Sequence, residues 1–366
     1  MNQLLKELGE RQPVWKGPRK DGITQSLLSP YIVCPERSRL QLIDGLRVPE
    51  AFSAPIHFGE MFHLCEENHL LGKDWSVALD KYIKQLGREF PHSKDDIWKW
   101  GRVCAVLYPV YVDYWKEQTR DYIGVMSEYP FKIPIKLPSG RWFFIRGKMD
   151  GVIVKDGKLW LMENKTKTEI DRVKIVKRLK FDVQTMLYLV ALSSLQKTHP
   201  KLVKYRDLEI AGVYYNVIRR PLSGGKGSIR RHKKTKTKPE ETWTAFFKRL
   251  REEHLIPDAN TYFDRFTAEL DNSDIPEFRR QFLHPVLDNL YDDYVWWALC
   301  YRRNWDPYDG ALRSKLFAHT KRHFRFPYGV YSPLIEGRGT GSDLDYFIDT
   351  GNNVGLEQTK NLFPEL

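Results

Sequence analysis

Hydrophobic residues in the first third of the chain recur at intervals of three and four positions, which is the spacing of one face of an α-helix. Ser29 and Pro30 suit the start of the first such segment, because serine caps helices and proline is tolerated in a first turn. The pattern therefore predicts a mostly helical N-terminal part. Its helices are expected at residues 29–42, 55–71, 75–88 and 94–119.

The pattern changes from helices to strands after Arg120. Asp156-Gly157 separates two runs of β-branched and aromatic residues, and Asp-Gly is a strong hairpin signal because both turn residues need a positive φ. We expect an α/β fold with a central, mostly antiparallel mixed sheet flanked by helices. Strands are expected at 122–136, 141–154, 158–165 and 209–218, and further helices at 170–179 and 181–197.

The rest of the chain divides by charge. Residues 219–238 carry nine Lys or Arg and no acidic residue around a glycine-rich stretch, which predicts a mobile basic loop. Residues 240–310 are acidic and are expected to be helical, with the longest helix at 275–303. Strand-like runs follow at 324–333 and 344–348. We expect four parts: a helical part (1–120), an α/β core (121–218), the basic loop (219–239) and a C-terminal extension (240–366).

Composition narrows the class of protein. The chain has 366 residues, of which 42% are hydrophobic, and this is typical of a globular protein. Its 59 Lys and Arg against 47 Asp and Glu give a net charge of +12, which suits a polyanionic partner. The first residues lack the apolar core of a signal peptide, and the longest apolar run, 186–195, is about half of what a membrane span needs.

The four cysteines, at positions 34, 65, 104 and 300, are far apart and contain no CxxC pair. This spacing favours neither a disulfide framework nor a zinc site. We expect a soluble, cytoplasmic protein with no membrane partner, in which Cys65 and Cys104 are small core residues.

The predicted hairpin brings two carboxylates together. With Asp156-Gly157 as the turn, the numbers of paired residues sum to 313, so Asp150 faces Glu163, and Lys165 lies on the same face. Opposed carboxylates repel unless a cation lies between them, and oxygen ligands suit Mg²⁺ or Mn²⁺. The backbone carbonyl of Asn164 is a candidate third ligand. A solvated strand face with alternating charges would give the same pattern.

Further motifs resemble those of the PD-(D/E)XK nuclease superfamily, and in particular its RecB-like exonuclease branch. Asp150 lies in an RGKMDGV segment that is followed by Glu163-Asn164-Lys165. Gln184 and Tyr188 match the QxxxY helix of that branch. Gly59 with His63 matches its upstream GxxxH helix, and Cys34-Pro35 its N-terminal segment. The motifs occur in the order typical of the family, over residues 26–192.

The resemblance implies a restriction-endonuclease-like core and a role for each residue. Asp150, Glu163 and His63 would bind the divalent metal ion. Lys165 would orient or deprotonate the attacking water and stabilise the phosphate. Gln184 and Tyr188 would position water, Lys165 or the DNA backbone. The alternative for His63, Gln184 and Tyr188 is an ordinary structural role in the core or on a helix surface.

The resemblance also raises the question of an iron–sulfur cluster, because many relatives hold one with an N-terminal cysteine and three closely spaced C-terminal cysteines. Cys34 is present, but no second cysteine lies near Cys300. We therefore expect no cluster, with hydrophobic packing closing that region instead.

Other basic residues are candidates for contacts with nucleic acid. The hairpin register places Lys148 opposite Lys165, where it would either contact DNA or simply be exposed. In the basic loop the candidates are Arg230, Arg231, Lys233 and Lys234, with a solvated linker as the alternative.

The function that these features predict is metal-dependent hydrolysis of DNA phosphodiesters. The resemblance favours an exonuclease of a phage or mobile element that serves recombination or replication. A recombinase, a helicase or a single-strand-binding protein is then the partner class to consider. A DNA-end-binding protein with a degenerate nuclease fold and an RNA-processing nuclease are the alternatives.

Overall fold

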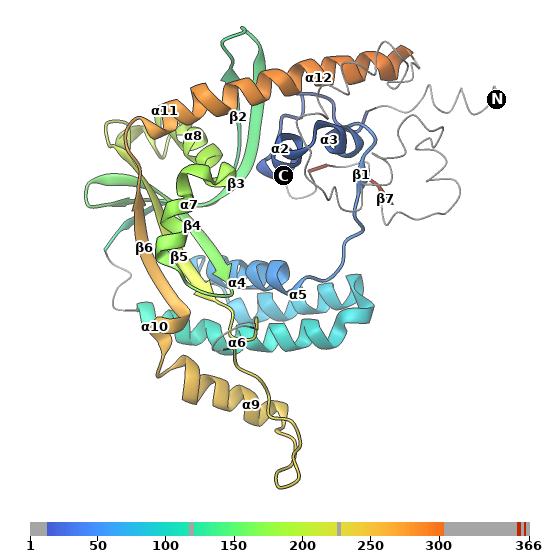
Figure 1. Ribbon diagram of the computed structural model, residues 1–366. Helices are drawn as coiled ribbons and strands as arrows, with labels where there is room; N and C mark the ends of the chain where they lie inside the picture. The colour runs from blue at the N-terminus through green and yellow to red at the C-terminus, as the bar shows by residue number, and fades with distance from the viewer. Residues whose placement is uncertain (1–12, 117–120, 225–227, 304–356, 360–361, 364–366) are drawn as a thin grey trace, which may run out of the picture.

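A five-stranded mixed sheet forms the centre of the computed structural model, which describes residues 13–116, 121–224, 228–303, 357–359 and 362–363 (Figure 1). The strand order is β2-β3-β4-β5-β6, in which only β4 and β5 are parallel neighbours. This arrangement confirms the predicted α/β fold with a mostly antiparallel mixed sheet. The strands are β2 (Ile123–Lys136), β3 (Trp142–Lys155), β4 (Lys158–Lys167), β5 (Ile210–Arg219) and β6 (Phe263–Glu269).

The β3–β4 hairpin has the predicted register. Asp156 and Gly157 have φ of 51° and 72°, as a tight hairpin turn requires. Lys155 pairs with Lys158, Val154 with Leu159 and Val152 with Leu161. The turn chemistry therefore fixes which side chains of β4 share a face.

The connection from β4 to its parallel neighbour β5 crosses one face of the sheet. It contains α7 (Arg172–Arg178), a 3-10 turn (Leu179–Phe181) and α8 (Val183–Thr198). Parallel strands need such a crossover, and α8 buries most of its apolar side chains against the sheet. The odd-numbered residues of β4, such as Leu159 and Leu161, point into this main core.

The edge strand β6 corrects a prediction. Residues 240–310 were expected to be helical, but Phe263–Glu269 pairs with β5 in antiparallel register. The pairing buries Phe263, Phe266 and Ala268, while Glu269 stays exposed. A segment of seven residues carries too little local pattern to predict a strand. It becomes a strand because the edge of β5 is available for pairing.

The start of the chain corrects a second prediction, because one expected helix is two. They are α2 (Gln25–Val33) and α3 (Pro35–Leu42), with Thr24 rather than Ser29 at the first N-cap. Cys34 is extended, with φ −155° and ψ 106°, because a residue before proline avoids the α region. Pro35 therefore opens a new helix, and Pro30 lies inside the first.

A second core lies beside the sheet. It is built by α4 (Ala54–Leu70), α5 (Trp75–Glu89) and α6 (Lys94–Trp115), close to their predicted positions (Figure 1). Cys65 and Cys104 are buried in it, as predicted. The other elements around this core are α9 (Trp243–Arg249), a π-helical turn (Leu250–Leu255) and α10 (Ala259–Tyr262).

The long C-terminal helix lies above α8 and α2 in the view of Figure 1, and it crosses the β2–β3 hairpin, whose tip extends past it. It consists of α11 (Asp274–Glu277), a π-helical turn (Phe278–Leu283) and α12 (His284–Arg303), close to the predicted 275–303. Beyond it, β7 (Glu357–Gln358) pairs with β1 (Leu46–Arg47). The strand-like runs predicted at 324–333 and 344–348 lie outside the described residues. No helix in the described ranges is long and apolar enough to cross a membrane.

Candidate metal centre and active site

The site begins where the β3–β4 ladder ends. The last pair is Gly151 with Met162, and beyond it the Asp150 side chain replaces a backbone partner. Its Oδ2 accepts a hydrogen bond of 2.7 Å from the backbone N–H of Asn164. Asp150 and Glu163 therefore lie at the point where the strands separate, one position past the paired region, as the register predicts.

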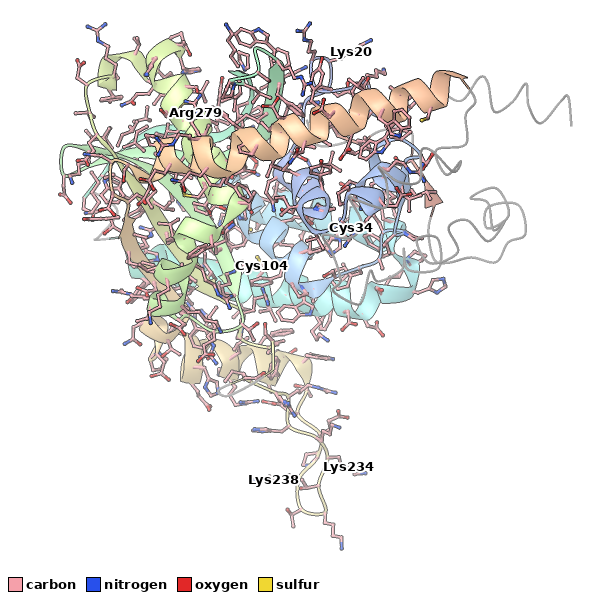
Figure 2. The ribbon with its side chains drawn as sticks, turned by 45° about the horizontal axis from the view of Figure 1, so that its top comes forward. Lys20, Cys34, Cys104, Lys234, Lys238 and Arg279 are labelled. Atoms are coloured by element: carbon pink, nitrogen blue, oxygen red, sulfur yellow. The ribbon has the colours of Figure 1, made fainter. Side chains whose placement is uncertain are left out.

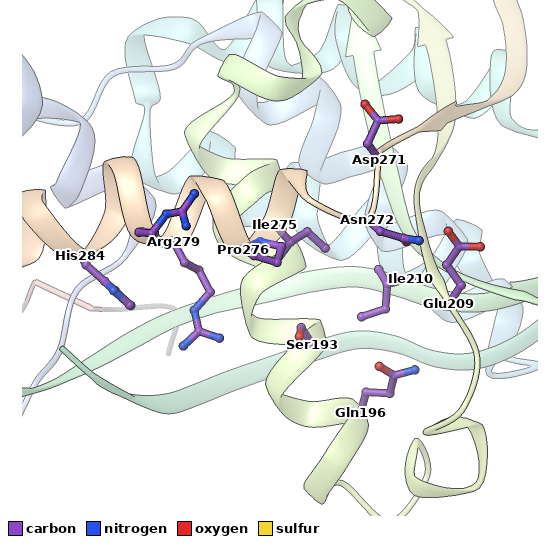
Figure 3. Close-up of a pocket in the computed structure, with 11 residues that line it drawn as sticks. Ser193, Gln196, Glu209, Ile210, Asp271, Asn272, Ile275, Pro276, Arg279 and His284 are labelled. Carbon is purple, nitrogen blue, oxygen red and sulfur yellow. The ribbon is translucent and has the colours of Figure 1, made fainter. Parts of the chain in front are cut away.

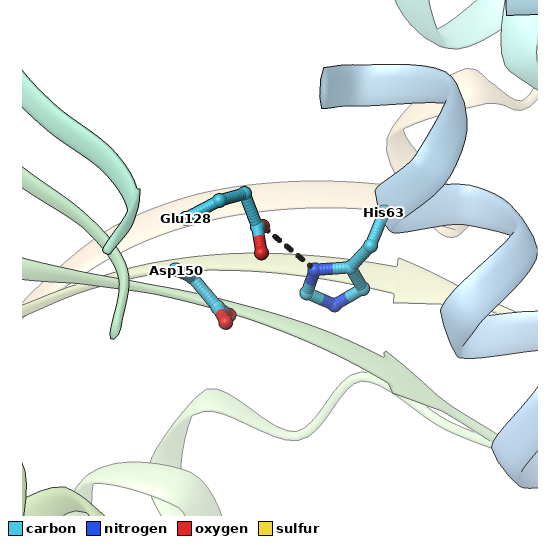
Figure 4. A group of neighbouring side chains, drawn as sticks. All are labelled: His63, Glu128 and Asp150. Carbon is cyan, nitrogen blue, oxygen red and sulfur yellow. Dashed lines mark hydrogen bonds and ion pairs between the residues drawn. The ribbon is translucent and has the colours of Figure 1, made fainter. Parts of the chain in front are cut away.

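Three side chains from three elements meet at this point (Figure 4). His63 comes from α4, Glu128 from β2 and Asp150 from β3, and their ligand atoms lie within 4.8 Å of one another. A Cβ at Gly59 would lie 3.4 Å from Thr166 in β4, so the helix passes close to the sheet one turn before His63. The predicted metal ligands His63 and Asp150 are thus brought together.

Glu128 is the member of the group that the sequence analysis missed. It lies between the β2–β3 pairs Ser127–Gly151 and Tyr129–Met149, so it is opposite Asp150. Its φ is +47°, which is uncommon for a residue other than glycine. The three-residue turn Pro138-Ser139-Gly140 would have given the signal, because Leu137 then lies opposite Arg141, paired residues sum to 278, and position 128 falls opposite 150.

Charge holds the three side chains together. Burial alone would lower the pKa of His63, but the hydrogen bond to Glu128, 3.4 Å away, and the charges of Asp150 and Glu66 raise it to about 9. Burial favours the neutral form of Glu128, yet His63 and Lys148 hold its pKa below the usual value. Burial raises the pKa of Asp150, against the opposing effect of His63. Without a metal ion, a protonated His63 is the cation between the two carboxylates.

Glu163 and Lys165 lie on the face of β4 that α8 covers. Glu163 is only 1% exposed and forms an ion pair with Lys165. Burial raises the pKa of Glu163 to about 7, although the Lys165 charge opposes the shift. The pKa of Lys165 is raised, because its attraction to Glu163 outweighs the effect of burial. Glu163 is not one of the three clustered groups, and its metal-binding role stays a prediction.

Gln184 and Tyr188 lie in the first turns of α8, close to Glu163. The helix begins at Asp182, whose side chain caps the backbone N–H groups of Gln184 and Thr185. Gln184 Nε2 lies 3.4 Å from Glu163 Oε1. Burial, together with the charges of Glu163 and Asp150, raises the pKa of Tyr188 to about 12.

The Tyr188 ring occupies a place that a small residue in β3 leaves open. A Cβ at Gly147 would lie 2.7 Å from Tyr188 and 2.8 Å from Phe131, whose ring meets Tyr188 edge to face at 5.4 Å. Gly147 is therefore required for the close approach of α8 to this strand. The QxxxY pair is thus adjacent to the acidic group, and its catalytic role stays a prediction.

A buried polar network, which no sequence pattern indicates, lies on the opposite face of the sheet. Asn216 in β5 donates to Asn164 Oδ1 at 2.9 Å and to the Tyr111 hydroxyl at 2.7 Å. Tyr111 in turn donates to Glu66 at 2.7 Å, and Arg265 donates to Tyr111 at 2.8 Å. Glu66 follows His63 by one helical turn, so the network fixes α4 and β4 relative to each other.

Lys148 differs from its predicted position. The β3–β4 ladder ends at Gly151 and Met162, so Lys148 is not paired with Lys165. Its Nζ lies 2.6 Å from Glu128 Oε2 instead. The reason is that β3 leaves β4 here and continues its pairing with β2 alone. A role for Lys148 in binding nucleic acid stays a prediction.

The basic loop projects from the body of the molecule below α9 (Figures 1 and 2). We call residues 228–241 the basic arm. The backbone N–H of Glu241 donates to the His232 carbonyl, and Thr235 N–H donates to the Lys238 carbonyl, so the arm doubles back on itself. Lys234 and Lys238 lie at its outer end (Figure 2).

The base of the basic arm is held by charge. Arg249 of α9 donates to both carboxylate oxygens of Glu241 at 2.8 Å. Arg231 pairs with Glu240 and lies over the Trp243 ring. Arg231, one of the predicted DNA contacts, is therefore already engaged by Glu240 and Trp243. The other three, Arg230, Lys233 and Lys234, are exposed.

The expected absence of an iron–sulfur cluster is untested. Cys34 and Cys300 are buried, but residues 304–356, which follow Cys300, lie outside the described part of the chain.

A separate cavity of about 410 Å³ lies between α8, the start of β5 and the α11 region (Figure 3). Among the residues known to line it are Gln196, Glu209, Arg279 and His284. None of the predicted site residues belongs to this lining, so the cavity is not part of the acidic site.

The acidic site has the donor set of a divalent cation centre. Carboxylate oxygens suit Mg²⁺ and Mn²⁺, and an imidazole can complete such a set. Within the described chain, Glu163 Oε2 is also buried without a hydrogen-bond partner, so this oxygen is free to accept a cation. The residues present therefore fit a metal ion.

The comparison with protein families agrees with this geometry. The family model of the PD-(D/E)XK nuclease superfamily matches residues 23–275, more than two thirds of the chain. No curated relative matches the sequence. The matched range contains the whole sheet, α8 and every residue of the acidic site. The mixed sheet with its flanking helices is accordingly a restriction-endonuclease-like fold, and the chain belongs to the PD-(D/E)XK nuclease superfamily.

Proposed function

We propose that the protein is a metal-dependent DNA nuclease of the RecB-like branch, and that it acts as an exonuclease. The observation that carries the proposal is the meeting of His63, Glu128 and Asp150 beside the Glu163–Lys165 pair, in a chain of a nuclease superfamily. Phage or mobile-element recombination or replication is the proposed setting, on the resemblance of the motifs alone.

His63, Glu128 and Asp150 would hold the metal ion, with Glu163 and the carbonyl of Asn164 as further ligands. A bound Mg²⁺ or Mn²⁺ would polarise the phosphodiester and lower the pKa of water. For His63 to bind a metal ion it must lose its proton, so metal affinity should increase with pH. Glu128 would then exchange its contact with protonated His63 for one with the metal ion.

Lys165 supplies a positive charge where negative charge develops on the phosphate. Its ion pair with Glu163 supports this role more than that of a base, because a base must be neutral. Gln184, which lies 3.4 Å from Glu163, would orient that carboxylate or the attacking water. Tyr188 would act with Gln184 from the same side of the sheet.

Chelation is expected to abolish hydrolysis. End-labelled linear DNA, circular DNA and RNA of the same sequence should be incubated with Mg²⁺, with Mn²⁺ and with EDTA. We expect degradation of linear DNA with metal only, and little cleavage of the circle. Cleavage that persists after verified metal removal would contradict the mechanism. Preferred digestion of RNA would assign the substrate differently, and binding without cleavage would indicate a degenerate nuclease.

Metal binding can also be measured without catalysis. Titration of the DNA-free protein with Mn²⁺, followed by calorimetry, should give an affinity that Glu128→Gln weakens by about 10- to 100-fold. Asp80→Asn, at an exposed position of α5, is the matched control and should bind as the wild type does. Equal affinities of all three proteins would exclude Glu128 from the metal centre.

The basic arm is expected to strengthen DNA binding without taking part in catalysis. Replacing Lys233, Lys234, Lys236 and Lys238 with glutamine removes exposed charges and leaves the ion pairs at its base intact. The slope of log affinity against log salt should fall by up to about 0.9 for each phosphate contact that is lost. Maximal turnover should change little.

The control for the arm is Lys81→Gln with Lys84→Gln, which removes two exposed charges from α5. This pair should leave the slope almost unchanged. If the fourfold arm variant also keeps the wild-type slope, the arm is a solvated projection with no part in DNA binding.

A further inference from the structure

A cavity of about 400 Å³ opens beside Lys165, on the side of β4 away from His63 and Glu128. We call it the α7 cavity. Its lining comes from residues 165–182, which include the end of β4 and all of α7, together with Tyr215 of β5. No metal ligand proposed above lines it, and the role of Lys165 at the scissile phosphate does not account for it.

Among the described residues that line the α7 cavity, four are basic and three are acidic, and Arg220 lies close enough to affect Lys167. Lys167 and Arg178 line it, and neither forms an ion pair within the described chain. Burial and the nearby charges of Lys165, Arg220 and Arg178 lower the pKa of Lys167, although the charge of Asp182 opposes the shift. Cations that repel one another in the free protein are stabilised when an anion lies between them.

The acidic side chains of the lining are Glu169, Asp171 and Asp182, and two of them also cap helices. Asp171 accepts from the backbone N–H of Lys174 at the start of α7. Asp182 accepts from Gln184 and Thr185 at the start of α8. Arg220 is half-buried, and its guanidinium donates hydrogen bonds to neutral oxygens of Thr166, Thr168 and Ser223.

An exposed aromatic ring lies at the edge of the same cavity. Phe181 is 84% exposed, although its neighbours Leu179 and Asp182 both line the cavity. An isolated exposed phenylalanine needs no explanation, but one in the chain segment that lines a cavity with the unpaired cations Lys167 and Arg178 offers the two kinds of group that bind single-stranded nucleic acid. Bases stack on such rings, while the cations bind the phosphates of the same strand.

We propose that the α7 cavity is the subsite for the nucleotide next to the scissile phosphate, with Lys167 and Arg178 binding its phosphate and Phe181 stacking on its base. This inference rests on the proposed nuclease function. It follows that the bound nucleotide is unpaired, because a base within a duplex does not offer its face to a side chain. Phe181 would then contribute to specificity, whereas Lys165 would act on the reacting phosphate.

Three variants separate the two parts of the subsite. Phe181→Ala removes the ring and Phe181→Trp retains an aromatic face. Lys167→Gln with Arg178→Gln removes the two charges. All of these side chains are exposed, so thermal melts should stay close to the wild type. The controls on α5, which contributes nothing to the lining, are Val77→Ala and Lys81→Gln with Lys84→Gln.

The measurement is the binding of a single-stranded oligonucleotide with 2-aminopurine near one end, in EDTA. Phe181→Ala should bind about tenfold or more weakly, with the salt slope unchanged and the fluorescence quenching by the protein lost. Phe181→Trp should restore both the affinity and the fluorescence quenching. The Lys167/Arg178 variant should lower the salt slope by about 1.4, which corresponds to two contacts on a single strand.

Hydrolysis assays with Mg²⁺ distinguish this subsite from the proposed function. If the wild type cleaves DNA and the subsite variants raise KM more than they lower kcat, both inferences hold. If the wild type cleaves and the Phe181 and Lys167/Arg178 variants match the α5 controls in binding and KM, the subsite is wrong and the nuclease function stands. If the wild type does not cleave, the proposed function fails, whatever the binding measurements give. If a blunt duplex with an internal 2-aminopurine binds as tightly as the single strand, the inference that the bound nucleotide is unpaired is wrong.

Discussion

Replacing Lys165 with alanine is expected to abolish hydrolysis while leaving DNA binding nearly intact. Lys165 lies beside Glu163 at the edge of the acidic group, where a scissile phosphate would meet the metal ion. Removing one preorganised group that stabilises developing charge costs about 100- to 1,000-fold in kcat. One positive charge among 59 basic residues contributes little to the overall attraction for DNA. Single-turnover cleavage and equilibrium binding of the same end-labelled DNA would measure the two effects separately.

The control for this variant must exclude loss of the fold. Without Lys165, the buried Glu163 loses its ion-pair partner, and this change can lower stability. Lys165→Met combined with Glu163→Gln removes both charges and should fold as well as the wild type, yet remain inactive. Lys197→Ala, on the exposed last turn of α8, should keep full activity. Turnover of Lys165→Ala near that of the wild type would remove Lys165 from the mechanism.

The stability of the metal-free protein is expected to fall as the pH rises from 5 to 9. Glu163 has a folded pKa of about 7 against an ordinary value of 4.5, so the folded state holds the extra proton between these values. Its contribution is therefore lost as pH rises from 4.5 to 7. His63, at about 9 against 6.5, contributes stability that is lost between pH 6.5 and 9. Thermal melts in EDTA across this range measure the loss as a fall in Tm.

The variant Glu163→Gln measures how much the Glu163 carboxylate contributes to the pH dependence of stability. The variant should lose the decrease between pH 4.5 and 7, and at pH 8 in EDTA it should be as stable as the wild type or several degrees more stable. Added Mn²⁺ should raise the Tm of the wild type, because ligand binding favours the folded state, and should raise that of the variant much less. Asp80→Asn is the surface control and should follow the wild type throughout.

The opposite result for Glu163→Gln has a definite meaning. If the variant melts clearly below the wild type at pH 8 in EDTA, the ion pair with Lys165 is a structural contact that stabilises the fold. The burial of the Glu163 carboxylate would then have a structural explanation, and the proposal that Glu163 binds the metal ion would no longer be supported. A metal-dependent rise in Tm that is equal in both proteins would exclude Glu163 as a ligand.

Local sequence alone determined the hairpin at the centre of the site. Asp156-Gly157 permits one tight turn, and the turn sets the register that places Asp150 opposite Glu163. The spacing of Gln184 and Tyr188 on one helix, and of Gly59 and His63 on another, is likewise a local property. These features depend on neighbours within a few residues, and such interactions can be read from a sequence.

The tertiary structure decided everything that depends on distant contacts. The register of the β2–β3 hairpin places Glu128 opposite Asp150, but only the packing of α4 brings His63 to both carboxylates. Strand β6 forms because β5 has an edge that accepts another strand. Asn216 joins α4, α6 and β4 through side-chain hydrogen bonds that no sequence pattern indicates. Lys148 contacts Glu128 and not the predicted Lys165, because the pairing of β3 with β4 ends at Gly151. Two strands separate where a side chain takes the place of a backbone partner, and that exchange depends on atoms that the chain brings together only when it folds.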